Sequence, residues 1–162
     1  MAERLPAGAG VIYRAFGAAD ALATARRLRD IAEARSLTLL IGRDAELAQA
    51  CGADGLHLPE IDSRRGPALR AAHPGWILTG AAHSEGAVAA CAAAGLDAAL
   101  LSPVFRSASR SAGQSLGLPQ FSAIARAAAL PVYALGGVNA ETAPGLIGSG
   151  AAGIAAVEGL LP

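Results

Sequence analysis

Seven short apolar segments alternate with six segments of helical character along this chain. The apolar segments are rich in leucine, isoleucine and valine, which is typical of buried strands. The predicted strands are residues 11–14, 37–41, 55–58, 76–80, 98–101, 131–135 and 153–157. The predicted helices are residues 19–36, 45–50, 62–72, 84–94, 119–129 and 140–147. Strict alternation with short links predicts an α/β fold with a parallel sheet and helical crossovers.

A weak repeat supports this architecture. Gly-Ala-Asp-Gly-Leu at residues 52–56, Gly-Leu-Asp-Ala-Ala at 95–99 and Gly-Ala-Ala-Gly-Ile at 150–154 each place a glycine between a helix and a strand. The first two copies are 43 residues apart, which is the length of two strand–helix units. Repetition of one unit favours a (β/α)8 barrel of the TIM type over a doubly wound sheet. No Gly-x-Gly-x-x-Gly follows the first strand, as it does in a dinucleotide-binding fold. We therefore predict a single barrel domain over residues 1–162.

The composition excludes several classes of protein. The 162 residues are 53% hydrophobic and only 4% aromatic, so small aliphatic side chains must fill the core. No apolar run approaches the roughly 20 residues of a membrane helix, and the first residues lack the pattern of a secretory signal. A net charge of zero with scattered arginines gives no indication of nucleic acid binding. We expect a cytoplasmic protein without a membrane or nucleic acid partner.

The cysteine and lysine content limits the chemistry that the protein can use. Cys51 and Cys91 are each near the end of an alanine-rich helical segment, so we expect reduced core residues and no disulfide. All 13 basic residues are arginine. The absence of lysine excludes a mechanism through a lysine Schiff base and also excludes a P-loop.

A polar loop follows the predicted strand at residues 98–101. Its hydroxyl and guanidinium groups belong to Arg106, Ser107, Ser109 and Arg110. Such donors suit an anion, most often a phosphate, although a solvated polar loop is the alternative interpretation. The next predicted strand runs into Gly136 and Gly137, where backbone amides can approach a ligand without a Cβ in the way. We predict that these two segments bind one phosphate group together.

Three motifs, in this order, resemble those of the thiamine-phosphate synthase family, which includes a thiazole tautomerase branch. Residues 52–58 are similar to the family's Gly-Ala-Asp-Gly-Val-His-Leu, residues 95–105 to its Gly-Ala-Asp-Tyr and Gly-Pro-Val-Phe, and residues 131–138 to its Pro-Val-Val-Ala-Ile-Gly-Gly-Ile. The resemblance covers nearly the whole chain. It implies a (β/α)8 barrel of thiamine biosynthesis, a transferase that joins a hydroxymethylpyrimidine pyrophosphate to a thiazole phosphate and releases pyrophosphate. Such a reaction depends on Mg²⁺ and on cationic residues around the leaving group.

The resemblance also assigns site residues. Arg14 is retained from the family's Gln-Leu-Arg-Glu-Lys run, and Asp62 matches the second metal aspartate. The first metal carboxylate falls on Arg43, although the neighbouring Asp44 is a possible substitute. The two threonines and the lysine of the family's phosphate loop fall on Ser107, Ser109 and Arg110.

Other positions depart from the family pattern. Phe16 stands at the lysine of the Gln-Leu-Arg-Glu-Lys run, and a family serine falls on Ala81. The last strand ends in Glu158, where the family has a serine near the phosphate and where an acid opposes anion binding. We therefore expect weakened synthase chemistry, with the phosphate half of the site better kept than the pyrophosphate half.

His83 supports an alternative to the synthase function. Ala82-His83-Ser84 resembles the Val-His-Ser of the tautomerase branch, in which the histidine moves a proton on a carboxythiazole phosphate. An imidazole that is neutral near pH 7 suits this work, but the histidine can also have a structural role at the start of the helix that Ser84 caps. The function hypotheses are a synthase-like enzyme, a tautomerase-like isomerase that uses His83, or a non-catalytic relative that binds a phosphorylated molecule.

The family pattern implies a strand before Met1 and a helix after Val157, so we expect a barrel without its first strand and last helix. Closure of the family barrel takes eight strands, and the chain supplies seven. Strand edges left open invite pairing between chains. We therefore expect a homodimer whose interface covers the gap between residues 11–14 and residues 153–157.

Overall fold

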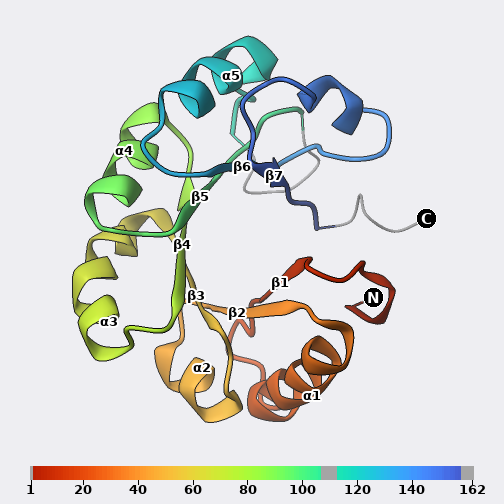
Figure 1. The fold of residues 1–162 in the computed structure, drawn as a ribbon, viewed down its shortest axis with the longest axis vertical. Helices are drawn as coiled ribbons and strands as arrows, with labels where there is room; N and C mark the ends of the chain where they lie inside the picture. The colour runs from red at the N-terminus through yellow and green to blue at the C-terminus, as the bar shows by residue number, and fades with distance from the viewer. Residues whose placement is uncertain (1, 107–112, 158–162) are drawn as a thin grey trace.

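The computed structural model describes residues 2–106 and 113–157. They form one parallel sheet of seven strands in the order β1-β2-β3-β4-β5-β6-β7. The strands are β1 (Gly10–Tyr13), β2 (Thr38–Gly42), β3 (Gly55–Leu58), β4 (Ile77–Ala82), β5 (Ala98–Leu101), β6 (Val132–Ala134) and β7 (Gly153–Ile154). The sheet curls into a C, and its edge strands β1 and β7 lie on the two sides of an opening (Figure 1).

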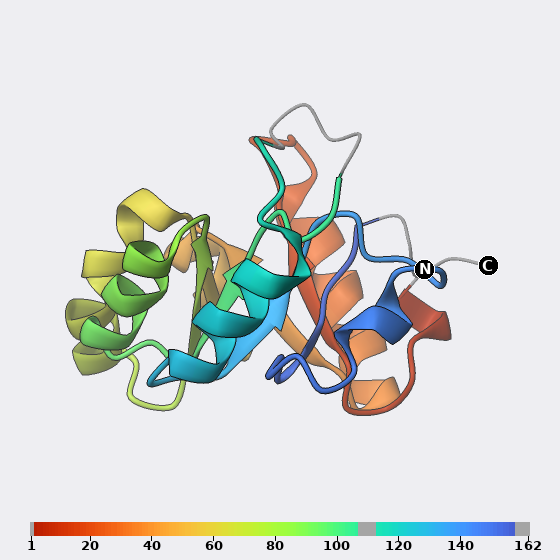
Figure 2. The ribbon, with the colours of Figure 1, turned by 90° about the horizontal axis from the view of Figure 1, so that it is seen from above.

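Five α-helices cover the convex side of the curled sheet (Figures 1 and 2). They are α1 (Ala21–Arg35), α2 (Ala45–Cys51), α3 (Gly66–Ala72), α4 (Glu85–Ala93) and α5 (Gly117–Ala127), with short 3-10 turns at η1 (Ala2–Arg4), η2 (Glu60–Arg65) and η3 (Ala143–Leu146). Two helix starts are capped by side chains of the types that favour this position. Asp44 Oδ1 accepts the Leu47 N–H at 2.9 Å, and Ser84 Oγ accepts the Ala87 N–H at 3.2 Å.

Alternate residues of each strand face the two sides of the sheet, which gives the fold two apolar layers. The convex layer includes Leu39 and Ile41 of β2 and packs in one cluster with helix residues such as Ala25 and Phe121. Leu40, between those two residues, is also buried but faces the concave side, outside that cluster. The curled sheet therefore has a second apolar surface, which is the inner side of the C.

The first glycine repeat has a structural role that fixes a strand start. Asp54 follows the left-handed C-cap Gly52 of α2 and precedes β3. Its carboxylate accepts the Leu39 N–H at 2.7 Å and an N–H of Arg29 at 2.9 Å. One side chain therefore ties α1 to the start of β2, beside the backbone hydrogen bond from the Asp54 N–H to the Leu39 carbonyl.

The second glycine repeat makes the same contacts. The Asp97 carboxylate accepts the Leu78 N–H and an N–H of Arg70, both at 2.7 Å. In the third copy the equivalent residue is Ala152, which has no carboxylate, and Arg126 of α5 donates instead to the Gly148 carbonyl. The repeat in the sequence is therefore a repeat of structure whose polar contact is kept in two of its three copies.

The predicted helix at residues 62–72 is wrong in its first part. That stretch contains the end of η2 followed by α3, because Pro67 lies in the first turn of α3. Proline has no N–H to donate and is tolerated only in the first turn of an α-helix, so it disfavours an α-helix that starts at residue 62 and has residue 67 in its interior.

The chain after β6 is also less regular than predicted. The predicted helix at residues 140–147 is only the 3-10 turn η3. Asn139 Oδ1 accepts the N–H groups of Glu141 and Thr142, which satisfies the backbone locally in a turn. The predicted strand at residues 153–157 pairs only over its first two residues, as β7. The other predicted elements agree with the structure to within two residues.

The prediction of a parallel α/β fold is confirmed, and closure of the sheet is not observed. Within residues 2–106 and 113–157 no strand joins β1 to β7, so the described chain is a curled seven-stranded half-barrel. Cys51 and Cys91 are free and buried, as expected. None of the described helices is long and apolar enough to cross a membrane.

Candidate functional site

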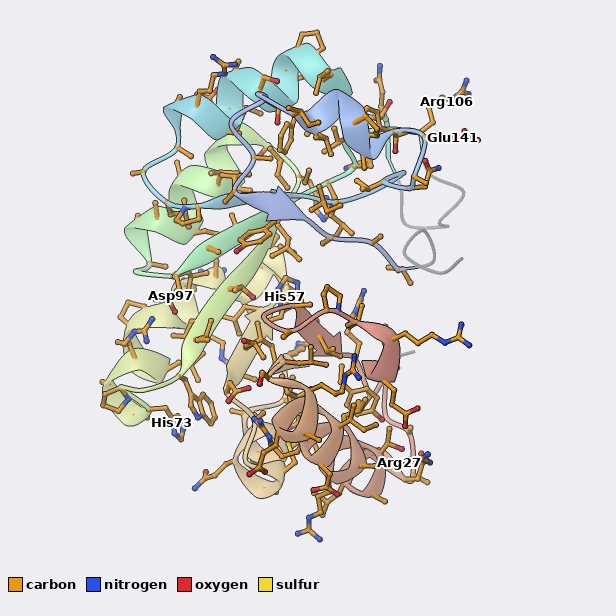
Figure 3. The ribbon with its side chains drawn as sticks, turned by 45° about the vertical axis from the view of Figure 1, so that its right-hand side comes forward. Arg27, His57, His73, Asp97, Arg106 and Glu141 are labelled. Atoms are coloured by element: carbon orange, nitrogen blue, oxygen red, sulfur yellow. The ribbon has the colours of Figure 1, made fainter. Side chains whose placement is uncertain are left out.

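The carboxyl ends of the seven parallel strands lie along one rim of the sheet. Arg106, which follows β5, and Glu141, which follows β6, lie on this side of the molecule (Figure 3). His73 and Asp97, which precede β4 and β5, lie on the opposite side. The described candidate site residues all follow strands and therefore share the carboxyl rim, where barrel folds build their sites. These residues are Arg14, Arg43, Asp62, His83, Gly136 and Gly137.

Arg43 and Asp62 form an ion pair at this rim. Arg43 follows β2, and its Nε lies 3.1 Å from Asp62 Oδ2 in η2. Arg65 Nη1 lies 3.9 Å from the same oxygen. The Arg43 side chain is 71% exposed while that of Asp62 is only 19% exposed, so the guanidinium covers the carboxylate from the solvent side.

These contacts do not fit the implied Mg²⁺ site. Asp62 Oδ2 is buried without a hydrogen-bond partner among the described residues, but two guanidinium groups already lie beside it. Asp44, the possible substitute, uses its carboxylate to cap α2. The described part of the chain contains no group of three or more His, Cys, Asp or Glu side chains that could hold a metal ion. Mg²⁺ needs several oxygen ligands in an octahedral arrangement, which these residues do not offer.

Arg14 follows the neighbouring strand β1 and packs beside Gly42, the residue before Arg43. Its Cγ lies so close to Gly42 that a Cβ there would be 2.9 Å away, so glycine at 42 leaves room for the arginine. The guanidinium lies 4.5 Å from the centre of the Phe16 ring, a cation–π contact. Arg14 and Arg43 are therefore held on adjacent loops by contacts that leave both charges at the rim.

His57, near the end of β3, is an uncharged neighbour of these arginines. Its Nδ1 lies 3.0 Å from Thr79 Oγ1 on β4. Burial, and to a lesser degree the positive charge of Arg14, lowers the pKa of His57 to about 4. The ring is therefore neutral at neutral pH, and the positive charge of the rim comes from arginine.

The predicted phosphate half contains the turn at Gly136 and Gly137. Both residues have positive φ, at 90° and 66°. A Cβ at Gly136 would lie 2.7 Å from Pro103 Cα, and one at Gly137 would lie 2.8 Å from Phe105 Cβ. The turn therefore packs directly against the segment that follows β5, and only glycine fits both its conformation and its contacts.

This packing brings the two predicted halves of the phosphate site together. The Phe105 N–H donates to the Gly136 carbonyl at 3.0 Å. Among the described residues, no hydrogen bond uses the N–H of Gly136 or Gly137. Arg106 lies directly after Phe105 and is exposed. Ser107, Ser109 and Arg110, the remaining predicted phosphate-binding residues, lie outside the described residues, as does Glu158.

His83 lies at the same rim, after β4, and is exposed. Its Nδ1 is 2.8 Å from the Ser102 carbonyl oxygen, with the Ser102 hydroxyl at 3.3 Å. A carbonyl oxygen only accepts, so Nδ1 carries the proton in this contact and Nε2 keeps its lone pair. The backbone N–H of His83 donates to Glu60 Oε2 at 2.9 Å, which fixes the turn before α4.

Four residues that support the site were not predicted from the sequence. Thr79 contacts His57, Arg65 contacts Asp62, and both Glu60 and Ser102 contact His83. In the pairs with His57 and His83, the two partners belong to or follow different strands, so the spacing along the chain does not identify these pairs. Arg65 comes three residues after Asp62 in η2, and this spacing is visible in the sequence. Their position near the ends of predicted strands was the available signal.

The comparisons with known proteins show the family of the chain. A family model described as "Thiamine monophosphate synthase" matches residues 2–160 of the chain. The chain belongs to this family. Among curated relatives, a putative thiamine-phosphate synthase of Geobacter sulfurreducens is 32% identical over 141 residues, which is 86% of this chain and 66% of the relative. A thiamine-phosphate synthase of Methanoculleus marisnigri is 33% identical over 143 residues, covering 88% of this chain and 68% of the relative. The chain thus spans about two thirds of the length of these synthases.

Solved structures support the fold of this thiamine monophosphate synthase family member. The thiamine phosphate pyrophosphorylase of Pyrococcus furiosus superposes with a TM-score of 0.79 at 22% identity, covering 91% of this chain and 71% of that chain. The N-(5'-phosphoribosyl)anthranilate isomerase of Pyrococcus furiosus gives a TM-score of 0.67 at 18% identity, over 99% of this chain and 82% of that chain. At these identities the likeness concerns the fold alone. The predicted family is confirmed by the family model and the curated relatives.

Proposed function

We propose that this protein is a thiamine-phosphate synthase-like barrel that binds a phosphorylated thiazole-type ligand and has weakened synthase chemistry. The turn at Gly136 and Gly137 is the observation that carries the proposal. Its amides are not used by other described residues, and it packs against the segment that leads into Ser107, Ser109 and Arg110. Backbone amides beside hydroxyl and guanidinium groups bind a phosphate well.

The weakened synthase chemistry follows from the pyrophosphate half of the site. Arg43 replaces a metal carboxylate and pairs with Asp62, the retained metal aspartate. Phe16, at the place of a lysine in the family pattern, is 81% exposed and contacts Arg14 rather than offering a charge of its own. Each lost transition-state contact typically costs ~10²-fold in rate, although such losses are not additive.

A thermal-shift screen with thiazole phosphate, thiamine phosphate and pyrophosphate, each with and without Mg²⁺, tests the proposal. We expect thiazole phosphate to raise the melting temperature, because its phosphate engages the glycine turn, and we expect synthase turnover well below ~10 s⁻¹. Arg110→Ala should reduce the shift, while Arg27→Ala, on the outer face of α1, is the charge-matched control (Figure 3). No shift with thiazole phosphate, or ordinary synthase turnover, would overturn the proposal.

A tautomerase-like isomerase is the second candidate, and the geometry of His83 favours it. Because Nδ1–H donates to the Ser102 carbonyl, Nε2 is free to take a proton from one atom of a bound ring and return it to another. No metal ion is needed for that step. In this reaction Arg14 binds and orients the ligand rather than exchanging a proton.

His83→Asn separates the candidates. If His83 moves a proton, the substitution abolishes tautomerase turnover and leaves the affinity for thiazole phosphate nearly unchanged. Equal loss of turnover and affinity indicates a structural histidine. Ligand binding with neither turnover supports the third hypothesis, a non-catalytic relative that binds a phosphorylated molecule.

A further inference from the structure

Two arginines lie beside a single buried carboxylate oxygen, and a third follows the neighbouring strand β1. Arg43 and Arg65 flank Asp62 at 3.1 Å and 3.9 Å. Arg14 packs on Gly42, the residue before Arg43. The pKa of His57 is lowered, so its ring is neutral and does not add to the charge. The only other carboxylate beside Arg43 in sequence is that of Asp44, which is turned to the N-terminus of α2.

The backbone at these loops is held in a conformation that most residues avoid. Arg43 has φ of 67° and Phe16 has φ of 48°, both in the left-handed region although neither is glycine. The Arg43 N–H donates to the His57 carbonyl at 2.9 Å, which holds this turn against the end of β3. Left-handed non-glycine residues are costly and are concentrated at functional sites. Here they set the positions of one guanidinium and of the ring that another guanidinium contacts.

We propose that Arg43 is the fixed cation of this site, in the place where the family's Mg²⁺ is implied, and that Arg14, Arg43 and Arg65 bind a diphosphate-type anion without a divalent metal ion. Asp62 is the positioning residue. Its contact with Nε of Arg43 holds one side of the guanidinium, and the exposure of that side chain leaves other N–H groups open to solvent. Guanidinium groups keep their charge at all relevant pH values and bind phosphoryl oxygens in pairs.

This inference deepens the proposed function, because it concerns the pyrophosphate half of the same rim. The phosphate half, at Gly136 and Gly137, is a separate set of residues. An experiment can therefore distinguish failure of the proposed function from failure of this inference. If inorganic pyrophosphate binds without metal but thiazole phosphate gives no thermal shift, the proposed function fails and this inference stands. The opposite result overturns this inference alone.

Calorimetric titration with inorganic pyrophosphate, in EDTA and in Mg²⁺, is the first test. We expect the wild-type dissociation constant in EDTA to equal that in Mg²⁺ within about threefold. Arg43→Gly should weaken binding in EDTA by tenfold or more and should fold well, because glycine suits the positive φ. Arg27→Ala removes an equal charge from the exposed outer face of α1 and should leave binding unchanged. The proposal would be overturned if pyrophosphate binding required Mg²⁺ or if no binding occurred in either buffer. It would also be overturned if the two substitutions had equal effects on binding.

Manganese binding, followed by electron paramagnetic resonance, is the second test and needs no activity. We expect wild-type protein to leave the spectrum of free Mn²⁺ unchanged. Arg43→Asp removes the guanidinium and adds a carboxylate beside Asp62, so it should raise Mn²⁺ affinity at least tenfold. Arg27→Asp is the matched control and should not. Tight Mn²⁺ binding by the wild type, or no gain in Arg43→Asp, would show that Arg43 does not take the place of the metal.

Discussion

At the scale of single residues, His57 makes folding sensitive to acid. Above pH 6.5 the histidine is neutral in both the folded and the unfolded chain. As the pH falls from 6.5 to about 4, the unfolded chain binds a proton that the folded chain, with its lowered pKa, does not bind. Folding stability therefore decreases over this window by ~3 kcal/mol and levels off below it. His57→Asn keeps a polar atom near the position of Nδ1 but does not titrate, so the variant should not show this decrease in folding stability.

Urea unfolding of wild type and His57→Asn at pH 7.5 and pH 4.5 measures the effect. We expect the wild type to lose about 2–3 kcal/mol more than the variant between the two values. Other titrating groups contribute equally to both proteins and cancel in the difference. The same pH dependence in both proteins would mean that His57 is protonated as easily in the folded state as in the unfolded state.

Single residues also show what the sequence can and cannot predict about the site. The replacement of a metal carboxylate by Arg43 is visible in the sequence once the family motifs are aligned. The ion pair with Asp62 is not, because the two residues follow different strands and the parallel pairing of β2 with β3 brings their loops together. The neutral state of His57 also depends on burial, which periodicity along one strand does not reveal.

At the scale of secondary-structure elements, Asp54 and Asp97 hold the starts of strands. The side chain of each aspartate accepts the N–H of a leucine in the preceding strand, and each also forms an ion pair with a helix arginine. Replacing either with alanine leaves that N–H without its acceptor, which typically costs about 1–3 kcal/mol. We expect Asp54→Ala and Asp97→Ala to lower the free energy of unfolding by this amount in urea titrations.

Two further variants serve as controls for these aspartates. Asp30→Ala removes an exposed acid from α1 and should change stability by less than about 0.5 kcal/mol. Ala152→Asp introduces the carboxylate that the third repeat lacks. The Ala152 N–H donates to the Val132 carbonyl at 2.8 Å, so a carboxylate at 152 can reach the Val132 N–H and should add about 1 kcal/mol. Destabilisation by Asp30→Ala as large as that by Asp54→Ala would contradict the assigned role.

Secondary-structure elements that are predicted correctly differ in local sequence from those that are predicted wrongly. Strands such as β3 and β5 are short, mostly apolar segments between glycine, proline or aspartate residues, and their predicted bounds agree with the structure. The stretch at residues 140–147 has apolar residues at helical spacing, but Pro144 and Gly145 limit it to a 3-10 turn. Pro144 and Gly145 are therefore the sequence signal against an α-helix here, although the apolar spacing favours one.

At the scale of the whole molecule, the open side of the half-barrel combines two strand edges with exposed apolar side chains. β1 and β7 each have one neighbouring strand within the described residues. Ile154 on β7 is 42% exposed and Val157 is 77% exposed, while Ile77 and Tyr133 on the concave side are also exposed. Unpaired strand edges beside apolar side chains favour association. The sequence-based expectation of a homodimer therefore remains a prediction with a defined location, the opening between β1 and β7.

Light scattering of the 162-residue chain at micromolar concentration tests this location. We expect a dimer, because a second copy can cover both edges and the apolar side chains between them, and twofold pairs are the commonest assemblies. Ile154→Lys places a charge at the β7 edge and should shift the protein toward monomer. Ile61→Lys changes an equally apolar side chain, 72% exposed on η2 and away from the opening, and should leave the dimer intact. A wild-type monomer with a sharp near-ultraviolet circular dichroism spectrum would mean that the chain tolerates its open edges without a partner.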